Sequence, residues 1–264
     1  MEQWFVQAGH GVRFDWGPAG ASVLAKEVAC LVVVDVLSFT TSVTVAVEAG
    51  VRVFPYRWRD ETAAVFADRM NATLAVGRST ATQASPWSLS PAALRRSPFT
   101  PRLVLPSPNG STIAAAARDC VVIAGSLRNA TAVGQWVAGR GFGTVERPVA
   151  VIASGERWPD GSMRPALEDL LGAGAVIASL RDSGKDRLSP EATMAAAAFE
   201  GIEDLGGTVT GCASGQELVD LGYADDVAIA TELNACKVIP VLTDGAFVSA
   251  KEFCPGGGVR YKDR

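Results

Sequence analysis

Short, strongly apolar runs alternate along this chain with longer stretches of helical character, and this rhythm constrains the fold more than any other feature. Runs that are apolar at successive positions suit parallel strands covered by helices on both faces. The sequence predicts strands at residues 31–36, 51–56, 73–77, 102–106, 120–125, 148–154 and 237–242. It predicts helices near residues 40–49, 61–70, 111–118, 129–139, 165–182, 190–204 and 214–221. The alternation favours the α/β class, as a three-layer α/β/α sandwich with a largely parallel or mixed sheet.

The chain of 264 residues has no stretch that reads as a linker, so one domain is expected over residues 1–264. Residues 78–101 interrupt the alternation with a segment rich in Ser and Pro. Because this segment is too long for a routine connection, it is predicted to be a functional loop. The C-terminal residues 255–264 are predicted to form a mobile tail.

Composition excludes several classes of function. The net charge is −4 and no stripe of Lys and Arg is present, which argues against a nucleic-acid partner. No apolar stretch is long enough to span a membrane, and the N-terminus lacks a secretory layout, so a cytoplasmic protein is expected. The five cysteines are scattered, and His10 is the single histidine, which argues against zinc sites and His-based triads. A homo-oligomer is left open.

Polar and charged residues follow most of the predicted strands. In an open parallel sheet the loops after the strands emerge at one edge, where ligands bind. Several of these loops lead into a predicted helix, whose free N–H groups favour an anion such as a phosphate. The candidate residues are Asp35, Thr40, Thr41, Arg78, Asn109, Gly110, Ser111, Arg128, Asn129, Ser154, Gly155, Glu156, Glu168 and Asp169.

Each candidate also has a purely structural interpretation. The hydroxyls near position 40 can cap a helix, and Asn109-Gly110 is a common turn. Glu168 and Asp169 can be acids in the first turn of a helix, where their negative charge interacts favourably with the positive end of the helix dipole. Successive helical residues point about 100° apart, so these two acids cannot both aim directly at one ligand. The case for a site therefore depends on all the candidates falling at one edge.

Asp35 is the candidate that a structural interpretation explains least well. It ends the apolar run 31–34, and an unpaired carboxylate is costly to bury. Its partner is expected to be an arginine or a divalent cation. Because hydroxyls, amides and carboxylates are available without a cluster of histidines or thiols, the expected cation is Mg²⁺. A magnesium ion beside a phosphate cradle predicts phosphoryl transfer or hydrolysis.

Four stretches together resemble the 2-phosphosulfolactate phosphatase (ComB-like) family, over roughly residues 28 to 248. "VVVDVLSFTTS" is similar to the family's strand with Asp-Val-Leu-Arg-Ala-Thr-Thr-Thr, and "LVLPSPNGST" to its Thr-Thr-Asn-Gly-Thr segment. "GSLRNATAV" resembles its Asn-Ala helix start, and "ALEDLLGAGAVI" its Glu-Asp-Leu-Leu helix. The resemblance implies a Mg²⁺-dependent phosphoric monoester hydrolase that converts 2-phospho-3-sulfolactate and water to 3-sulfolactate and phosphate.

The resemblance also suggests a role for each candidate residue. Asp35 with an acid of the pair Glu168 and Asp169 is expected to hold Mg²⁺, directly or through water. Arg78 and Arg128 are expected to stabilise charge in the transition state, and Glu156 to act as an acid–base group. The expected substrate-binding residues are Thr40, Thr41, Asn109, Gly110, Ser111, Asn129, Ser154 and Gly155.

The chain departs from the family pattern at several positions. The arginine after Asp-Val-Leu is Ser38 here, and Gly77-Arg78 lacks the glutamate that the family has between these residues. The family's Gly-Asn-Ser-Pro is matched only by Ser90-Pro91, and its Cys-Ala-Gly reads 153–155 Ala-Ser-Gly. Arg128 and Arg157 are cations that can compensate. The expected substrate is therefore a small acidic phosphate ester whose identity stays open.

Two alternatives are left open by these residues. Asp35 can be a covalent nucleophile, as in haloacid dehalogenase-like phosphatases, although Leu37 stands where their second Asp would be. The chain can also be a small-anion binding or sensing protein that kept the pocket and lost a catalytic ligand. The glutamate missing beside Arg78 is the feature that favours this second alternative.

Overall fold

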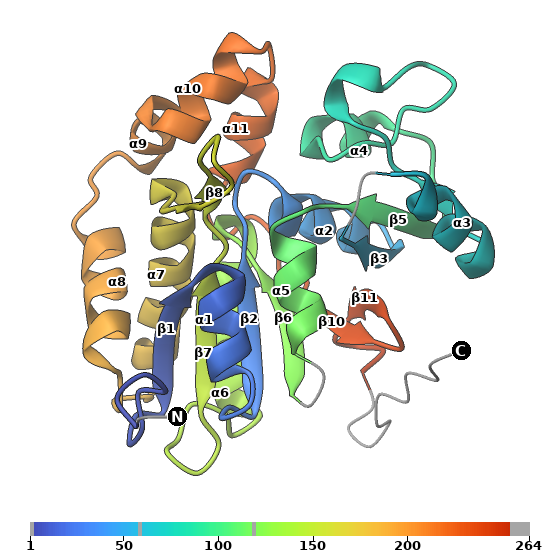
Figure 1. Cartoon of the computed structure of the whole chain (residues 1–264). Coiled ribbons are helices and arrows are strands. Elements are labelled where there is room, and N and C mark those ends of the chain that lie inside the picture. Colours follow the sequence, from blue (N-terminus) through green and yellow to red (C-terminus); the bar gives the residue numbers. More distant parts are fainter. Residues whose placement is uncertain (1–2, 58–59, 118–119, 254–264) are drawn as a thin grey trace.

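The computed structural model describes residues 3–57, 60–117 and 120–253, so the predicted tail at 255–264 lies outside the described residues. Within them the main sheet has nine strands, and helices lie on both of its sides (Figure 1). The strands follow in the order β1 (Val12–Trp16), β7 (Val149–Ala153), β2 (Cys30–Val34), β6 (Val121–Gly125), β10 (Pro240–Thr243), β11 (Ala246–Ser249), β3 (Arg52–Tyr56), β5 (Arg102–Pro106) and β4 (Thr73–Leu74).

Three layers arise from the alternation of side chains along the buried strands. In β2, Val32 and Val34 belong to one hydrophobic core, whereas Leu31 and Val33 belong to a second core on the opposite face. The first core is covered by α6 (Ala130–Gly139), α7 (Leu167–Asp182) and α8 (Pro190–Glu200). The second is covered by α1 (Gly17–Leu24), α2 (Phe39–Glu48) and α5 (Gly110–Ala116). The predicted α/β class is confirmed.

The remaining elements surround one end of this sandwich. The predicted loop at 78–101 contains a 3₁₀ turn (Arg78–Thr80) and the short helix α4 (Pro91–Arg96), and α3 (Glu61–Met70) packs beside β5. A helical unit of α9 (Leu205–Gly211), α10 (Ala213–Asp220) and α11 (Ala224–Ala230) lies above α7 and a small ribbon of β8 (Glu156–Arg157) and β9 (Met163–Arg164) (Figure 1). Among the described helices, none combines the length and the apolar composition needed to cross a membrane.

The strands do not all run in one direction, whereas the site predicted from the sequence assumed a parallel sheet with all its loops at one edge. β1, β7, β2 and β6 are parallel, but the β10–β11 hairpin is antiparallel to its neighbour on each side. The strands β3, β5 and β4 are parallel to one another and therefore run against the first group. Figure 1 shows β3 and β5 lying crosswise to β2 and β6. This crossing, and not a shared parallel edge, brings the end of β5 towards the end of β2.

Asn129 belongs to the framework of this fold and not to a ligand site. Its Oδ1 accepts hydrogen bonds from the backbone N–H and the hydroxyl of Ser126, at 2.8 Å and 3.2 Å. Its Nδ2 donates to the carbonyls of Ala124 and Val238, at 3.2 Å and 3.1 Å. An amide has two donors and two acceptor sites, so the side chain has no capacity left for a phosphate. The structure thus gives Asn129 a role other than the predicted substrate binding.

Arg128 is also held in the framework, away from the predicted chemistry. Its side chain is 3% exposed, and it forms ion pairs with Glu48 at 3.3 Å and Glu232 at 3.2 Å. These contacts join the last turn of α2 to the segment after α11. The structure thus gives Arg128 a structural role, with its Nη1 buried without a hydrogen-bond partner among the described residues, and its predicted role in the transition state stays a prediction.

Replacing Arg128 by Met is expected to reduce the free energy of unfolding by about 3 kcal/mol, because removing one partner of a buried ion pair leaves the other charge uncompensated. The measurement is urea unfolding followed by circular dichroism. The matched control is Arg95→Met: Arg95 pairs with the same Glu232, but its side chain is 36% exposed. This control should lose about 1 kcal/mol or less. Equal losses in the two variants would contradict a structural role specific to Arg128.

Candidate active site

Asp35 joins the starts of two helices that come from different halves of the sheet. It directly follows β2, and its side chain is buried. Oδ1 accepts the backbone N–H of Phe39 at 3.0 Å, and Oδ2 accepts that of Gly110 at 3.0 Å. A β-carbon on residue 110 would lie 2.3 Å from the ring of Phe39 and 2.8 Å from Oδ2 of Asp35. Glycine at this position is therefore required for the close approach of α5 to the carboxylate.

Asp169 makes an equivalent junction on the other side of β2. Its Oδ1 accepts the N–H of Val36 at 2.7 Å, and its Oδ2 accepts that of Gly155 at 2.9 Å. Gly155 has φ = +65°, a left-handed conformation that glycine adopts without strain. The first turn of α7 thus ties the loop after β2 to the loop after β7. Asp35 and Asp169, two of the three predicted metal ligands, are consequently also structural clamps.

Glu168 points to a different neighbour, as expected for successive helical residues. Its Oε2 accepts a hydrogen bond from the thiol of Cys212 at 3.3 Å, and both side chains are buried. Burial raises the pKa of Cys212 to about 11, with the charge of Glu168 adding to the rise, so the thiol keeps its proton near neutral pH. Cys212 caps α10, whose Gly215 N–H reaches the sulfur at 3.4 Å. Through this contact the helical unit α9–α11 is attached to the cluster of acids.

Glu156 completes the cluster from the β8–β9 ribbon. Its Oε2 accepts a hydrogen bond from Nδ2 of Asn109 at 3.1 Å, which links the loop after β5 to the loop after β7. The structure therefore brings Asp35, Asn109 and Glu156 together with the acids at the start of α7. Within the described residues, no group of three or more His, Cys, Asp or Glu side chains has the arrangement needed to hold a metal by itself.

Burial and the neighbouring carboxylate charges raise the pKa values of Asp35, Glu156 and Asp169. Burial, and then the charges of Asp35 and Glu168, hold the pKa of Asp169 well above its usual range. Burial also raises the pKa of Asp35, while its two backbone N–H donors lower it. Burial together with the charges of Asp35 and Glu168 raises the pKa of Glu156 to about 7, and the charge of Arg164 lowers it. The negative charge of these four carboxylates thus exceeds the positive charge of the nearby cations, Arg78 and Arg164.

Arg78 is the predicted cation that the structure does bring to this cluster, where its charge lowers the pKa of Asp35. Its Nη2 donates to the hydroxyl of Ser38, and its Nε donates to Asp226 at 3.1 Å.

Asp226 is almost fully buried and also accepts hydrogen bonds from the hydroxyl of Ser90 at 2.5 Å and the N–H of Ala92 at 3.1 Å. The ring of Tyr223 lies 5.7 Å from the guanidinium.

The hydroxyls near Asp35 have distinct uses. Thr40 hydrogen-bonds the backbone of Asp35, and Ser111 donates to the carbonyls of Tyr56 and Ser107, so the structure gives these two predicted substrate-binding side chains a structural role. In contrast, the hydroxyls of Thr41 and Ser154 are buried without a hydrogen-bond partner among the described residues.

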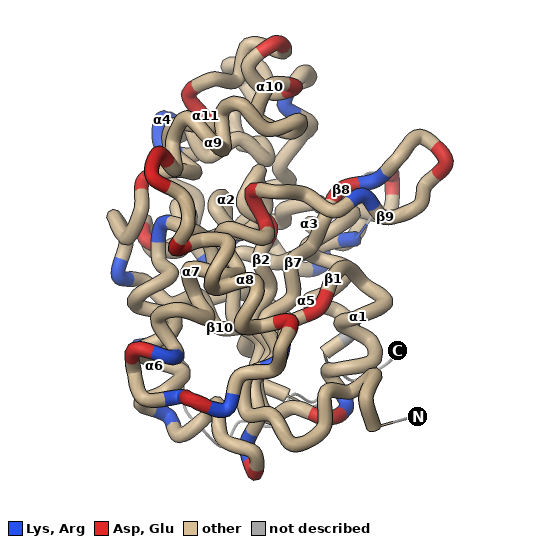
Figure 2. Tube along the Cα trace, turned by 90° about the vertical axis from the view of Figure 1, so that its left-hand side faces the viewer, with Lys and Arg blue, Asp and Glu red and all other residues tan. Residues whose placement is uncertain are grey.

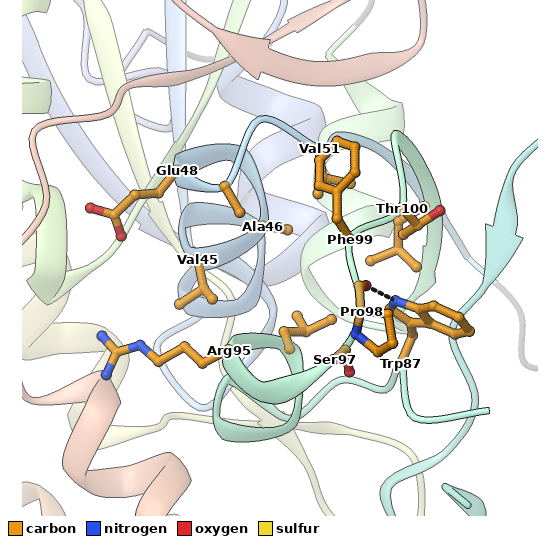
Figure 3. A pocket seen from close by; sticks show the side chains of 13 residues that line it. Val45, Ala46, Glu48, Val51, Trp87, Arg95, Ser97, Pro98, Phe99 and Thr100 are labelled. Carbon is orange, nitrogen blue, oxygen red and sulfur yellow. Dashed lines mark hydrogen bonds between the residues drawn. The ribbon is translucent and has the colours of Figure 1, made fainter. Parts of the chain in front are cut away.

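A separate hollow of 300 Å³ lies beside the opposite end of α2 (Figure 3). Figure 3 shows Val45, Ala46, Trp87 and Phe99 around it, with the charged Glu48 and Arg95 towards one side. It contains none of the predicted site residues, so it is distinct from the cluster at Asp35.

Sequence analysis missed three groups that set this site: Cys212, Asp226 and Arg164. The first two come from the helical unit, and no pattern around them indicates their partners. Arg164 could have been predicted from the sequence, because "WPDGS" at 158–162 is typical of a tight turn. A hairpin at that turn places Glu156 directly opposite Arg164, which is the observed register.

Glu156→Gln is expected to raise the thermal midpoint at pH 8 and to change it little at pH 4. The ordinary pKa of this group is 4.5, and in the fold it is about 7. Between these values the folded protein keeps a proton that the unfolded chain releases, so stability falls as pH rises through this window. Melting curves in metal-free buffer measure the effect, with exposed Glu61→Gln as the control. A variant with the wild-type dependence on pH would contradict the assignment.

Comparisons with known proteins identify a family for this chain. The family model for 2-phosphosulpholactate phosphatase matches residues 21–245. A probable 2-phosphosulfolactate phosphatase of Thermotoga petrophila is 27% identical over 227 residues, which cover 84% of this chain and 92% of that protein. A probable 2-phosphosulfolactate phosphatase of Carboxydothermus hydrogenoformans is 29% identical over 215 residues, which cover 80% and 84%.

The predicted family, and with it the predicted class of enzyme, is confirmed by these matches. The match spans the strand that ends at Asp35, the loop with Asn109 and the helix with Glu168 and Asp169. This chain belongs to the 2-phosphosulfolactate phosphatase family, a family of phosphoric monoester hydrolases.

Proposed function

We propose that this chain is a Mg²⁺-dependent phosphatase that hydrolyses a small acidic phosphate monoester, of the kind represented by 2-phospho-3-sulfolactate, to the alcohol and phosphate. The observation that carries the proposal is the gathering of four carboxylates, those of Asp35, Glu156, Glu168 and Asp169, beside Arg78, where loops from both halves of the sheet meet. The family match supports the same class of reaction. A cytoplasmic location and a homo-oligomer remain expectations from the sequence.

The donor set fits magnesium. Mg²⁺ in proteins is bound through one or two carboxylates, with water and substrate phosphate completing its shell, so a cage of three acids is not needed. Glu168 has one carboxylate oxygen without a hydrogen bond from the described residues, and Asp35 and Asp169 each use one lone pair per oxygen on backbone N–H groups. Asp35 with Glu168 or Asp169 would hold the ion, which would neutralise phosphate charge and assist the attack of water when bound.

The phosphate group would be held by donors that the fold leaves without partners. The buried hydroxyls of Thr41 and Ser154 are two such donors, and each lies in a loop or first turn that is tied to the acid cluster. Arg78 has one terminal nitrogen, Nη1, that makes no hydrogen bond with the described residues. This nitrogen can stabilise the charge that develops on the phosphoryl oxygens.

Glu156 is the group suited to proton transfer. A catalytic acid or base works best when its pKa lies near the working pH, and the pKa of Glu156 is about 7. Its hydrogen bond from Asn109 orients the carboxylate and leaves the other oxygen open. In the proposed reaction Glu156 takes a proton from the attacking water or supplies one to the leaving oxygen.

The direct test is phosphate release from a panel of phosphate esters, with Mg²⁺ or with a chelator. Asp35→Asn should lower kcat/KM by roughly 100-fold or more, because several kcal/mol of charge stabilisation depends on this site. Added Mg²⁺ should raise the thermal midpoint of the chelator-treated wild type but not that of the variant. Asp60→Asn, which removes an exposed acid at the start of α3, should behave as wild type. Binding of phosphate without any release would instead favour the anion-binding alternative.

Glu156→Gln tests the acid–base role separately. The variant should retain binding but lose roughly 100-fold or more in kcat. The limb of the wild-type pH–rate profile that has an apparent pKa near 7 should disappear, because the titrating group is gone. A variant that keeps this limb at a uniformly reduced rate would show that another group transfers the proton.

A further inference from the structure

The β8–β9 ribbon holds a cation beside the acid cluster. Glu156 and Arg164 are directly opposite each other in its antiparallel register. The turn is closed by two backbone hydrogen bonds, from Trp158 to Ser162 at 2.9 Å and from Gly161 to Trp158 at 2.8 Å. Figure 2 shows the ribbon extending from the body of the molecule with acidic and basic positions along it. A closed turn of this kind fixes the position of Arg164 relative to Glu156.

Arg164 is held in place without a neutralising partner. Its Nη2 donates to the hydroxyl of Ser214 at 3.2 Å, and its guanidinium lies 5.7 Å from the ring of Trp158. Among the described residues, no carboxylate comes within ion-pair distance of it, whereas Arg78 is paired with Asp226. The side chain is nevertheless half-buried. A half-buried guanidinium with open N–H groups is suited to binding an external anion.

Ser214 connects this cation to the catalytic carboxylates. It lies in the first turn of α10, the helix that Cys212 caps while donating to Glu168. Ser214 is buried, and a β-carbon on the next residue, Gly215, would lie 1.9 Å from the carbonyl of Val209. The turn is therefore tightly packed. One turn of α10 positions both an acid of the site and the guanidinium of Arg164.

We propose that Arg164, oriented by Ser214, is the specificity-determining residue that binds the second acidic group of the substrate, a carboxylate or sulfonate on the alcohol part. The inference rests on the proposed phosphatase function and names the substrate class of that site. Arg78 lies at the Asp35 side of the cluster, where the phosphate is proposed to bind. Arg164 lies opposite Glu156 in the ribbon, and its charge lowers the pKa of that carboxyl. A doubly acidic ester entering this negative cluster needs a second cation, and guanidinium matches the geometry of a carboxylate or sulfonate.

The experiment compares two esters that differ only at the second acidic group. In 2-phospholactate a carboxylate stands where isopropyl phosphate has a methyl group. Arg164→Gln should lower kcat/KM for 2-phospholactate by roughly 30-fold, mainly through KM, because a charge-assisted contact to the ground state is lost. The same variant should hydrolyse isopropyl phosphate within about twofold of wild type. Arg164→Lys should recover part of the lost selectivity.

Arg157→Gln is the matched control. Arg157 lies in the same ribbon, is exposed and donates to the carbonyl of Gly161 at 3.0 Å. Because successive strand residues point to opposite faces, Arg157 points away from Glu156, and the compensating role expected for it from the sequence is not supported. Arg157→Gln should leave the ratio of the two rates unchanged. A 30-fold loss with 2-phospho-3-sulfolactate and none with 2-phospholactate would identify the sulfonate as the bound group. Equal losses of Arg164→Gln on isopropyl phosphate and on the two acidic esters, or no loss on any of the three, would overturn the proposal.

Binding of 3-sulfolactate, measured by calorimetry, separates this inference from the proposed function. If the wild type released no phosphate from any ester, the proposed function would fail. The inference would still be supported if the wild type bound 3-sulfolactate and Arg164→Gln bound it roughly 30-fold more weakly. If both proteins bound it equally, or neither bound it, Arg164 would have no role in recognising acidic groups.

Discussion

The hydrogen bonds from the backbone N–H groups of Phe39 and Gly110 to the carboxylate of Asp35 are the constraint on which the site depends. Strands β2 and β5 belong to halves of the sheet that run in opposite directions, so nothing in the strand order alone aligns the loops that follow them. One buried carboxylate that accepts an N–H from each loop does align them. Bonds of this charge-assisted kind are stronger than neutral ones. Without a side chain at Gly110, the two helix starts can meet at this acid.

The same arrangement explains why so much negative charge is tolerated in one place. Asp35 and Asp169 each accept two backbone N–H groups, which favour the ionised form against the cost of burial. Glu168 and Glu156 accept one hydrogen bond each, from a thiol and an amide. The acids thus divide into two clamps that shape the site and two groups with open oxygens. In the proposed function, the open oxygen of Glu168 would join Asp35 in holding a cation, and Glu156 would carry the transferable proton.

Sequence patterns predicted much of the framework because the buried strands are continuous apolar runs. β6 and β7 lie within the predicted 120–125 and 148–154, and β2 begins one residue before the predicted 31–36. β1 and β11 were missed, since β1 contains Arg13 and Asp15 and β11 is a short hairpin partner.

The acids that follow strands indicated where a site could lie, but the sequence could not separate binding groups from structural ones. Arg128 and Asn129 resemble ligands in sequence because framework and site use the same polar residues after strands.

The cations beside the acid cluster are positioned by side chains from a distant segment of the chain. The family pattern has an arginine where this chain has Ser38, yet the guanidinium of Arg78 contacts the Ser38 hydroxyl. Asp226 and Tyr223 of the helical unit hold that guanidinium, and Ser214 of the same unit holds Arg164. Positive charge is thus supplied to the acid cluster by side chains that depend on α9–α11. The positions of these two guanidinium groups therefore depend on the packing of α9–α11, whereas Asp35 and Asp169 are fixed by backbone N–H groups in the loops and helix starts that follow the strands.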